Sequence, residues 1–399
     1  MGVLYIYNKA FAGNCYWSEK RSRVTSVFTY DDEYLSGVDN WNIDPSLILT
    51  TGAQTSKNGL PNAFRDAAPD RWGQTLIRHR FLRESRASGK PMRTINEVDY
   101  LLGVNDATRQ GDLRFTIEKG GAFQRPSEDI PKIVALPKLL SASHSYAVKQ
   151  DEDAIAYLLD AGSASLGGAR PKAAVSDEKD LYIAKFPHRQ DKWDVMAWEW
   201  VCLNTAVEAG ISVPASRLVE IDGQNILLVK RFDRESNGRV GYISTMTLLG
   251  LTDGEHADYS EIAEKLRNVS VSPKADLLEL YRRIAMSLLI NNTDDHLRNH
   301  GLLRSGSGWR LAPAFDINPN PDLSAMRNTS VFGEIDNDAA LAALSDNAQD
   351  FDISGQEAVV ILAEVSAAVK SCGKFAERAG ISMAERNMMF RAFCVKTGS

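Results

Sequence analysis

The sequence is poor in cysteine, and the few cysteines that it has lie far apart. Cys15, Cys202, Cys372 and Cys394 form no CxxC pair in a chain of 399 residues. Structural zinc sites and disulfide frameworks use numerous or closely spaced cysteines, so the sequence favours neither. This use of cysteine fits a reducing compartment.

The chain also lacks the segments that direct proteins to membranes or to export. The start "MGVLYIYNKAFAG" has no basic stretch followed by an apolar core, which a signal peptide needs. No run of about 18 uninterrupted apolar residues occurs, so no membrane span is expected. We expect a cytoplasmic protein with no membrane partner.

An excess of positive charge is the third absence. Lysine and arginine number 46 against 52 acidic residues, and the net charge is −6. Domains that bind nucleic acid usually present a basic face, so we expect DNA to be contacted only indirectly, through a partner. The length of 399 residues exceeds one core of usual size and predicts two or three lobes.

The first 125 residues are predicted to be mixed α/β. Strands are expected within 3–17 and 24–35, separated by a basic turn. A helix is expected to begin near Pro69, with Asp66 or Asp70 as its cap. The polar stretch "QRPSEDIPK" is the best candidate for a linker, and helical periodicity follows it.

A strand-rich segment comes next. A Gly-rich turn, "GSASLGGARPK", precedes two strands, and the second strand ends at Lys185. A helix follows, with one apolar stripe that includes Trp198 and Cys202. The pair Asp222-Gly223 predicts a two-residue hairpin turn, because it tolerates positive φ angles. From about residue 255 the chain is expected to be mainly helical, apart from one hairpin within 301–317.

The stretch "NNTDDHLRNH", residues 291–300, crowds carboxylates, histidines and asparagines behind the apolar run "RRIAMSLLI". Such residues favour turns, so one interpretation is a helix end followed by a turn. A second is a metal hydrolase, because His296 and His300 have the ligand spacing of HExxH. Arg298 stands between them and the general-base glutamate is missing, so this interpretation is weak.

The third interpretation is phosphoryl transfer, and the order of motifs favours it. Protein kinases place a catalytic Asp five residues before a metal-binding Asn, which is the spacing of Asp294 and Asn299. A second metal-binding Asp is needed after a strand pair, and Asp316 lies there. Mg²⁺ takes hard oxygen ligands and only one or two carboxylates, which Asn299 and Asp316 supply.

Two residues upstream complete the kinase pattern. Lys185 ends a predicted strand, where it could hold phosphates. Glu199 lies in the apolar segment "MAWEWV" of the next helix. A buried carboxylate needs a partner, so Glu199 is predicted to pair with that lysine.

The motifs "SLGGARPKA", "IAKF", "KRFDR", "NNTDDHLRNHG" and "LAPAFDI", in this order, resemble the HipA family of bacterial toxin Ser/Thr kinases. "FTYDDEYL" and "AFRDAAPDRWG" resemble that family's N-terminal domain. The resemblance implies an α+β fold, in which a two-lobed domain similar to protein kinases and phosphoinositide kinases follows an N-terminal mixed α/β subdomain. We expect the subdomain in 1–125, the N-lobe with Gly-rich loop and hinge in 126–236, and the helical C-lobe in 237–399.

The resemblance also implies roles for single residues. Asp294 resembles the catalytic aspartate, Asn299 and Asp316 the magnesium ligands, and Lys185 the lysine on the nucleotide phosphates. His296 keeps the family's position two residues beyond the catalytic Asp and is expected to orient the loop. Ser165 matches a serine that family members autophosphorylate, which expels its loop and silences the kinase. The other positions implied for the nucleotide are Gly167, Gly168, Ala169, the backbone of Lys230 and Phe232 for adenine, and Asp233 for ribose.

Two features depart from familiar patterns. "GSASLGGARPK" is neither a GxGxxG kinase loop nor a Walker A sequence, which fits this family better than a generic kinase. Asp295 stands where the family often has a small residue. Two adjacent aspartates leave two candidates for the base, and the spacing to Asn299 favours Asp294.

The resemblance implies an ATP- and Mg²⁺-dependent protein Ser/Thr kinase, the toxin of a toxin–antitoxin pair. Its expected partner is a small helix-turn-helix antitoxin similar to HipB, and its expected substrate is a translation component such as an aminoacyl-tRNA synthetase. Two alternatives stay open. One is a transcriptional co-repressor with vestigial kinase activity, and the other is a kinase for a small molecule.

Overall fold

The structure is a computed structural model that describes residues 1–21, 23–38, 40–56, 58–89, 93–124, 130–149, 151–163, 170–236 and 238–394. The chain packs as two compact units. Unit 1 comprises Met1–Arg189 and Asp233–Ile243, and unit 2 comprises Gln190–Phe232 and Ser244–Ser399. The three segments expected from the sequence are a division by function and stay a prediction. Within the described residues, no helix is both long and apolar enough to cross a membrane.

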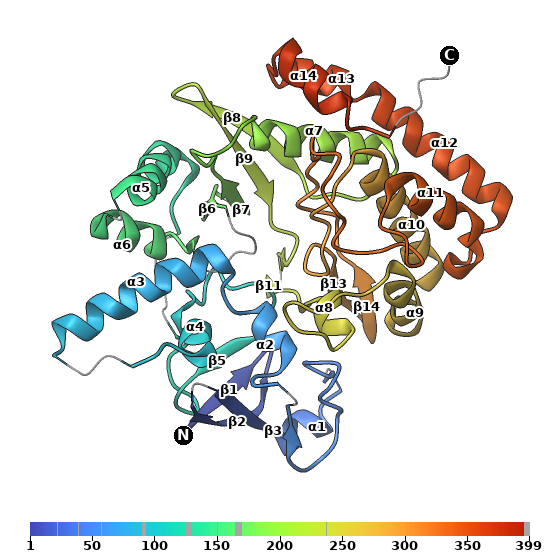
Figure 1. Ribbon diagram of the computed structural model, residues 1–399. Coiled ribbons are helices and arrows are strands. Elements are labelled where there is room, and N and C mark those ends of the chain that lie inside the picture. The colour runs from blue at the N-terminus through green and yellow to red at the C-terminus, as the bar shows by residue number, and fades with distance from the viewer. Residues whose placement is uncertain are drawn as a thin grey trace. The chain divides into compact units, whose positions relative to one another are not determined.

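A five-stranded antiparallel sheet forms the start of unit 1, in the order β4-β3-β2-β1-β5 (Figure 1). The predicted strands within 3–17 and 24–35 are confirmed, except that the sequence "DEYLS" forms a short helix. The strands are β1 (Gly2–Tyr7), β2 (Phe11–Lys20), β3 (Arg23–Tyr30), β4 (Gln54–Thr55) and β5 (Arg114–Thr116). Buried aromatic rings such as Phe28, Phe64 and Phe115 pack edge to face in the core of this unit.

Helices and two hairpins complete unit 1. Asp70 caps α3 by accepting a hydrogen bond from the backbone N–H of Gly73 at 2.7 Å, which confirms one of the two predicted caps. The helices are α1 (Asp32–Ser36), α2 (Asn62–Asp66), α3 (Arg71–Ala87), α4 (Glu97–Gly103), α5 (Leu136–Lys149) and α6 (Glu152–Asp160). The hairpins are β6 (Lys172–Ser176) with β7 (Leu181–Lys185), and β10 (Arg234–Glu235) with β11 (Gly238–Arg239).

Unit 2 contains the second predicted hairpin and the helix before it. Strands β8 (Ser216–Ile221) and β9 (Gln224–Lys230) are joined by Asp222 and Gly223, whose φ angles are +50° and +72°. Both angles are positive, as the turn prediction requires. The helix α7 (Val195–Glu208) is buried almost all round, not along one stripe as predicted. It packs on β9 with one side and on C-terminal helices with the other.

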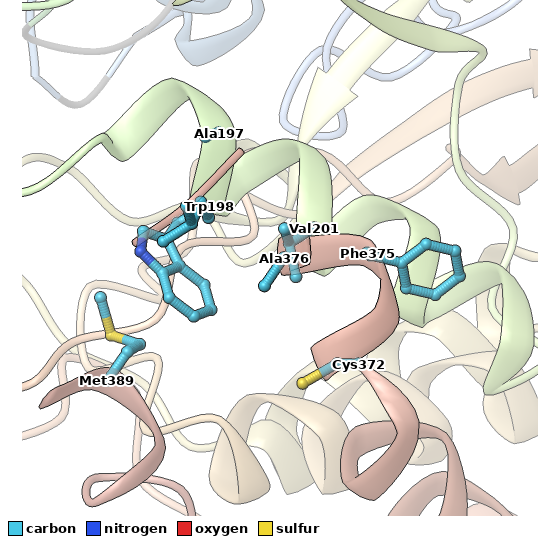
Figure 2. Close-up of a cluster of buried hydrophobic side chains, with 8 residues drawn as sticks. Ala197, Trp198, Val201, Cys372, Phe375, Ala376 and Met389 are labelled. Carbon is cyan, nitrogen blue, oxygen red and sulfur yellow. The ribbon is translucent and has the colours of Figure 1, made fainter. Parts of the chain in front are cut away.

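Figure 2 shows the second of these contacts. Trp198 and Val201 of α7 lie beside Phe375 and Ala376 of α13 and Met389 of α14. The α10 helix packs against α9, α11 and α12 (Figure 1). The remaining helices of unit 2 are α8 (Thr245–Leu248), α9 (Tyr259–Val269), α10 (Pro273–Leu289), α11 (Asn337–Asp346), α12 (Gly355–Ser371), α13 (Gly373–Arg378) and α14 (Met383–Phe390).

Two short elements remain. The predicted hairpin within 301–317 is confirmed as β13 (Gly301–Ser305) with β14 (Gly308–Leu311). The strand β12 (Tyr242–Ser244) lies just before α8. Between α10 and α11, this hairpin is the only helix or strand pair among the described residues. Residues 291–300 and 312–336 are therefore held by isolated backbone hydrogen bonds and by side-chain hydrogen bonds.

Gly162, the first residue of the predicted Gly-rich turn, provides a test of the packing in unit 1. Its φ is +67°, and an added Cβ would lie 2.5 Å from Oγ1 of the fully buried Thr108. We expect Gly162→Ala to lower the free energy of unfolding by about 2–4 kcal/mol, from left-handed strain and overpacking together. Gly120→Ala is the control, because Gly120 has a similar φ of +73° but open space around it. It should cost only about 1–2 kcal/mol. Equal losses in urea unfolding would contradict this account.

Candidate active site

The loop that carries the predicted catalytic residues starts where α10 ends. Asn291 takes a left-handed conformation, with φ of +53°. Its Nδ2 donates to the carbonyl oxygens of Asn320 (2.7 Å) and Asp322 (3.2 Å), and its Oδ1 accepts from Nδ2 of Asn337 (2.7 Å). Nδ2 of Asn320 donates to Oγ1 of Thr293 at 2.8 Å. Asparagine side chains therefore tie the end of α10 to the chain after Asp316 and to the start of α11.

The two adjacent aspartates have opposite environments. Asp294 is exposed, and its Oδ1 accepts a hydrogen bond from Nδ2 of Asn328 at 2.9 Å. Asp295 is 6% exposed, and both of its carboxylate oxygens are occupied. Its Oδ2 accepts from the hydroxyl of Tyr259 at 2.5 Å, and its Oδ1 lies 2.9 Å from Nε2 of His300. Of the two candidate bases, Asp294 is the one that faces solvent.

Electrostatics also set Asp294 apart. Although it is exposed, the surrounding loops remove part of its hydration, and this is the largest influence that raises its pKa above the usual value. The charges of Asp316 and Asp295 act in the same direction, while His296 and Asn328 oppose them. The two predicted site residues Asp294 and Asp316 therefore lie within electrostatic range of each other.

The pKa of Asp295 is shifted the other way. Burial on its own would raise this pKa, because it disfavours the charged form. The electrostatic effect of His300, the hydrogen bonds from His300 and Tyr259, and the charge of Arg327 outweigh burial and hold the pKa of Asp295 below its usual range. Asp295 is therefore a buried anion that the protein stabilises.

The predicted metal ligands, Asn299 and Asp316, each have a defined local conformation. Nδ2 of Asn299 donates to the carbonyl oxygen of Asp294 at 3.0 Å, which fixes the orientation of the amide. No donor in the described parts of the chain binds its Oδ1, so this oxygen can face a ligand. Asp316 has φ of +58°, and its Oδ1 lies 3.5 Å from Nδ2 of Asn318. An amide oxygen and a carboxylate near a second carboxylate are the hard donors that Mg²⁺ prefers.

The two histidines of the loop have separate environments. The backbone N–H of His296 donates to the carbonyl of Asp294 at 2.9 Å, and its Nδ1 accepts from the N–H of Arg298 at 3.3 Å. His300 is buried against Asp295. The contacts of His296 agree with a role in shaping the loop. Nδ1 of His296 and Nε2 of His300 already bind the protein, which does not favour the metal-hydrolase interpretation.

In unit 1, the predicted phosphate lysine lies on the β6–β7 hairpin. Lys185 is half-buried at the end of β7, and its cross-strand neighbour is Lys172. Paired residues on one face of a hairpin lie close together, so two lysines share this face. Nζ of the buried Lys172 is 3.0 Å from Oδ2 of Asp70. Asp233, predicted to face ribose, is 3% exposed, and its Oδ2 accepts from the N–H of Gly111 at 2.8 Å.

In unit 2, the predicted adenine residues are Lys230, which ends β9, and Phe232, which comes just after it. The N–H of Lys230 donates to the carbonyl of Ala215 at 2.8 Å. The ring centroid of Phe232 lies 5.6 Å from that of Phe315, the residue before Asp316. The predicted hinge and the chain just before Asp316 therefore share an aromatic contact. Glu199 is 2% exposed within α7. Its pairing with Lys185, and the nucleotide roles of these residues, stay predictions.

Residues 164–169 of the Gly-rich turn lie outside the described residues. Ser165, Gly167, Gly168 and Ala169, predicted to contact the nucleotide, are all among them. The neighbouring Ser163 is described, and it is fully buried.

Four residues of the site were missed by the sequence analysis. Asn328 and Thr329 bind the loop directly, because Oγ1 of Thr329 donates to the carbonyl of Asp295 at 2.7 Å. Tyr259 and Arg327 are buried beside it. These residues lie more than 25 positions from the loop, and no spacing rule connects them. The only signal was the polar stretch "RNTS" directly after the exposed Met326.

Comparison with known families matches the chain twice. The family model for the HipA-like C-terminal domain matches residues 164–373, which is more than half of the chain. The family model for the HipA N-terminal domain matches residues 5–104.

Individual relatives are more distant. "Putative kinase Y4mE" of Sinorhizobium fredii is 27% identical over 156 residues, covering 36% of each chain. "Putative kinase" of Haemophilus influenzae is 26% identical over 135 residues, covering 29% of this chain and 39% of that one. The chain thus spans little more than a third of these curated relatives. A Shewanella oneidensis MR-1 structure, described as the toxin–antitoxin system HipA, HipB and operator DNA complex, matches with a TM-score of 0.69. It is 14% identical and covers 98% of this chain and 94% of that one, which confirms the expected fold class.

Asp295→Asn should expose the energetic role of the buried carboxylate. We expect the free energy of unfolding to fall by about 3 kcal/mol at pH 7, because the buried Arg327 loses an anionic neighbour. The folded pKa of Asp295 lies below its unfolded value of about 3.9, so its stabilisation is complete above that pH and is lost as the pH falls. The gap between wild type and variant should therefore narrow below about pH 4.

Asp294→Asn is the matched control for urea unfolding at several pH values. The raised pKa of Asp294 means that folding disfavours its charge, so this variant should be neutral or slightly stabilising at pH 7. A gap for Asp295→Asn that stays constant from pH 7 to pH 3 would contradict the assignment of a buried anion.

Proposed function

The chain belongs to the HipA family, and on this premise we propose that it is an ATP- and Mg²⁺-dependent protein serine/threonine kinase that acts as the toxin of a toxin–antitoxin pair. The observation that carries the proposal is the loop of Asp294 and Asn299. An exposed carboxylate stands five residues before an amide whose nitrogen is bonded to the carbonyl of that same aspartate. This arrangement suits a base and a metal ligand that act on one phosphoryl group.

Asp294 is the proposed general base. One carboxylate oxygen is held by Asn328, which leaves the other for the hydroxyl of a serine or threonine. A base must lie within hydrogen-bond reach of the proton that it takes, and its pKa should be closer to the working pH than that of an ordinary aspartate. The raised pKa of Asp294 meets the second condition.

Asn299 and Asp316 are the residues that would hold Mg²⁺. The hydrogen bond through Nδ2 leaves Oδ1 of Asn299 available for this role. The charge of Asp316 helps to raise the pKa of Asp294, an effect that a bound cation would oppose. When bound, the ion would neutralise charge on the phosphates of ATP. The protein's own part is to orient the amide through the Asp294 carbonyl and to hold Asp316 in its left-handed conformation.

The proposed roles in nucleotide binding rest on family membership, residue by residue. Lys185 would bind phosphate, supported by its position beside Lys172 on the hairpin face. Backbone groups at Lys230 and Phe232 would meet adenine. Asp233 is proposed near the ribose, although its carboxylate already binds the N–H of Gly111.

Partner and substrate follow from family membership. The structurally similar protein from Shewanella is described with HipB and operator DNA, which supports a HipB-like antitoxin here and indirect contact with DNA. The proposed substrate is a protein of translation, such as an aminoacyl-tRNA synthetase. A co-repressor with vestigial activity has no need of an exposed base with a raised pKa, so the kinase is preferred. A small-molecule kinase remains the alternative for the substrate class.

Asp294→Asn and Asp316→Asn should separate the base from the metal ligand. Both variants are expected to lose phosphoryl transfer from ATP by about 100-fold or more. Asn tolerates the left-handed conformation of residue 316, so the fold should persist. Calorimetric titration should show that Asp294→Asn still binds Mg-ATP, while Asp316→Asn no longer gains affinity from Mg²⁺. Substantial activity in Asp294→Asn would exclude Asp294 as the base.

Ser165 is the proposed site of autophosphorylation. A phosphate there would add a charge of about −1.5 to −2, which would repel the phosphates of ATP and weaken nucleotide binding. After incubation with Mg-ATP, mass spectrometry should find phosphate on Ser165 but not on the buried Ser163. Ser163→Ala should keep the modification, whereas Ser165→Ala and Asp294→Asn should lack it. ATP binding that is equally tight before and after phosphorylation would refute the switch.

A further inference from the structure

Three buried residues stand next in sequence to three residues of the proposed site. Asp295 follows Asp294, His300 follows Asn299, and Arg327 precedes Asn328. The buried members are only 6%, 4% and 6% exposed, respectively. Of their neighbours in the proposed site, Asp294 and Asn328 are exposed, and Asn299 is buried and binds the Asp294 carbonyl.

The buried residues form one cluster around the Asp295 carboxylate. The hydroxyl of Tyr259 donates to Oδ2 at 2.5 Å, and Nε2 of His300 lies 2.9 Å from Oδ1. The rings of Tyr259 and His300 meet edge to face, with centroids 5.6 Å apart. Arg327 adds positive charge nearby and is fixed by Oγ of Ser287 at 2.7 Å. These contacts hold the Asp295 carboxylate in place on both of its oxygens.

The loop is thus closed by two cross-links, offset by one residue. Nδ2 of Asn299 donates to the carbonyl oxygen of Asp294, and the next residue, His300, pairs with the carboxylate of Asp295. The chain after Asp316 repeats this pattern. Asn328 donates to the carboxylate of the exposed Asp294, and the next residue, Thr329, donates to the carbonyl oxygen of the buried Asp295.

We infer that Asp295, His300 and Tyr259 are positioning residues for phosphoryl transfer, which set the Asp294 carboxylate and the Asn299 amide in reacting geometry. This inference rests on the proposed function. A misplacement of a reacting group by about 1 Å can slow an enzyme about 100-fold. A rigid cluster that fixes the loop of the base and the metal ligand should therefore affect the rate directly. A cluster that served stability alone would change the fraction of folded protein and nothing else.

The first test compares two hydroxyl deletions. Tyr259→Phe removes the donor to Asp295, and Ser270→Ala removes a similar donor, at 2.6 Å, to the buried carboxylate of Asp276. Asp276 lies near the start of α10, about 20 Å along the helix from its site end. We measure ADP release at saturating Mg-ATP per folded molecule, and the apparent KM for Mg²⁺.

Tyr259→Phe should lower kcat about tenfold and raise the KM for Mg²⁺ several-fold, since Asn299 is displaced with the loop. Ser270→Ala should shift the melting temperature but leave both constants unchanged. Unchanged constants in Tyr259→Phe, or equal changes in both variants, would overturn the inference.

A second pair of variants tests rescue. The amide nitrogen of Gln can replace Nε2 as donor to Asp295, so His300→Gln should retain most of the kcat that His300→Leu loses. Equal loss in the two variants would show that the bond to Asp295 is not what matters.

Crystal structures of the variants test the positioning role without any measurement of activity. In His300→Leu, or in Tyr259→Phe if the former does not fold, the Asn299 Nδ2 to Asp294 carbonyl distance should lengthen from 3.0 Å to beyond hydrogen-bonding range. An unchanged loop overturns the positioning role whether or not the protein is a kinase. A wild-type protein without ATP-dependent transfer overturns the proposed function alone.

Discussion

A carboxylate that is 6% exposed must find its hydrogen bonds inside the protein, and Asp295 finds them in two separate parts of unit 2. One donor, Tyr259, is the first residue of α9, and the other, His300, ends the same loop. An unpaired charge at this depth would cost several kcal/mol. The position of the loop relative to α9 and to residues 327–329 is therefore a consequence of neutralising one buried charge.

The asparagines extend this constraint to the neighbouring elements. Asn291 follows α10 in a left-handed conformation, and its amide nitrogen donates to the carbonyl oxygen of Asn320. Its amide oxygen accepts from Asn337, which ties the start of α11 to the same loop. An amide offers both a donor and an acceptor. The side chains of Asn291, Asn320 and Asn337 can therefore bind polar groups of the loops that no strand or helix satisfies. Loops without regular structure thereby hold Asp294 and Asp316 near each other.

Periodicity and spacing predicted the regular parts of this protein well. The turn at Asp222, the cap at Asp70 and the hairpin after the loop all depend on residues close in sequence. The apolar stripe predicted on α7 was too narrow, because β9 covers one side of the helix and helices that follow residue 372 cover the other. Asn328 and Tyr259 lie 34 and 36 residues from their partners in the loop, and such contacts exist only once the chain has folded.

Asp294 and Asp295 are chemically identical, so spacing alone gave only a preference between them. Their surroundings make the distinction. Asp295 accepts bonds on both oxygens and has its pKa lowered, which removes it as a proton acceptor near neutral pH. Asp294 loses part of its hydration, and together with the charges of Asp316 and Asp295 this outweighs the opposing effect of His296, so its pKa rises. Neighbouring carboxylates whose pKa values are driven apart can take different tasks. Here the carboxylate with the lowered pKa, Asp295, holds the loop, while the one with the raised pKa, Asp294, faces solvent.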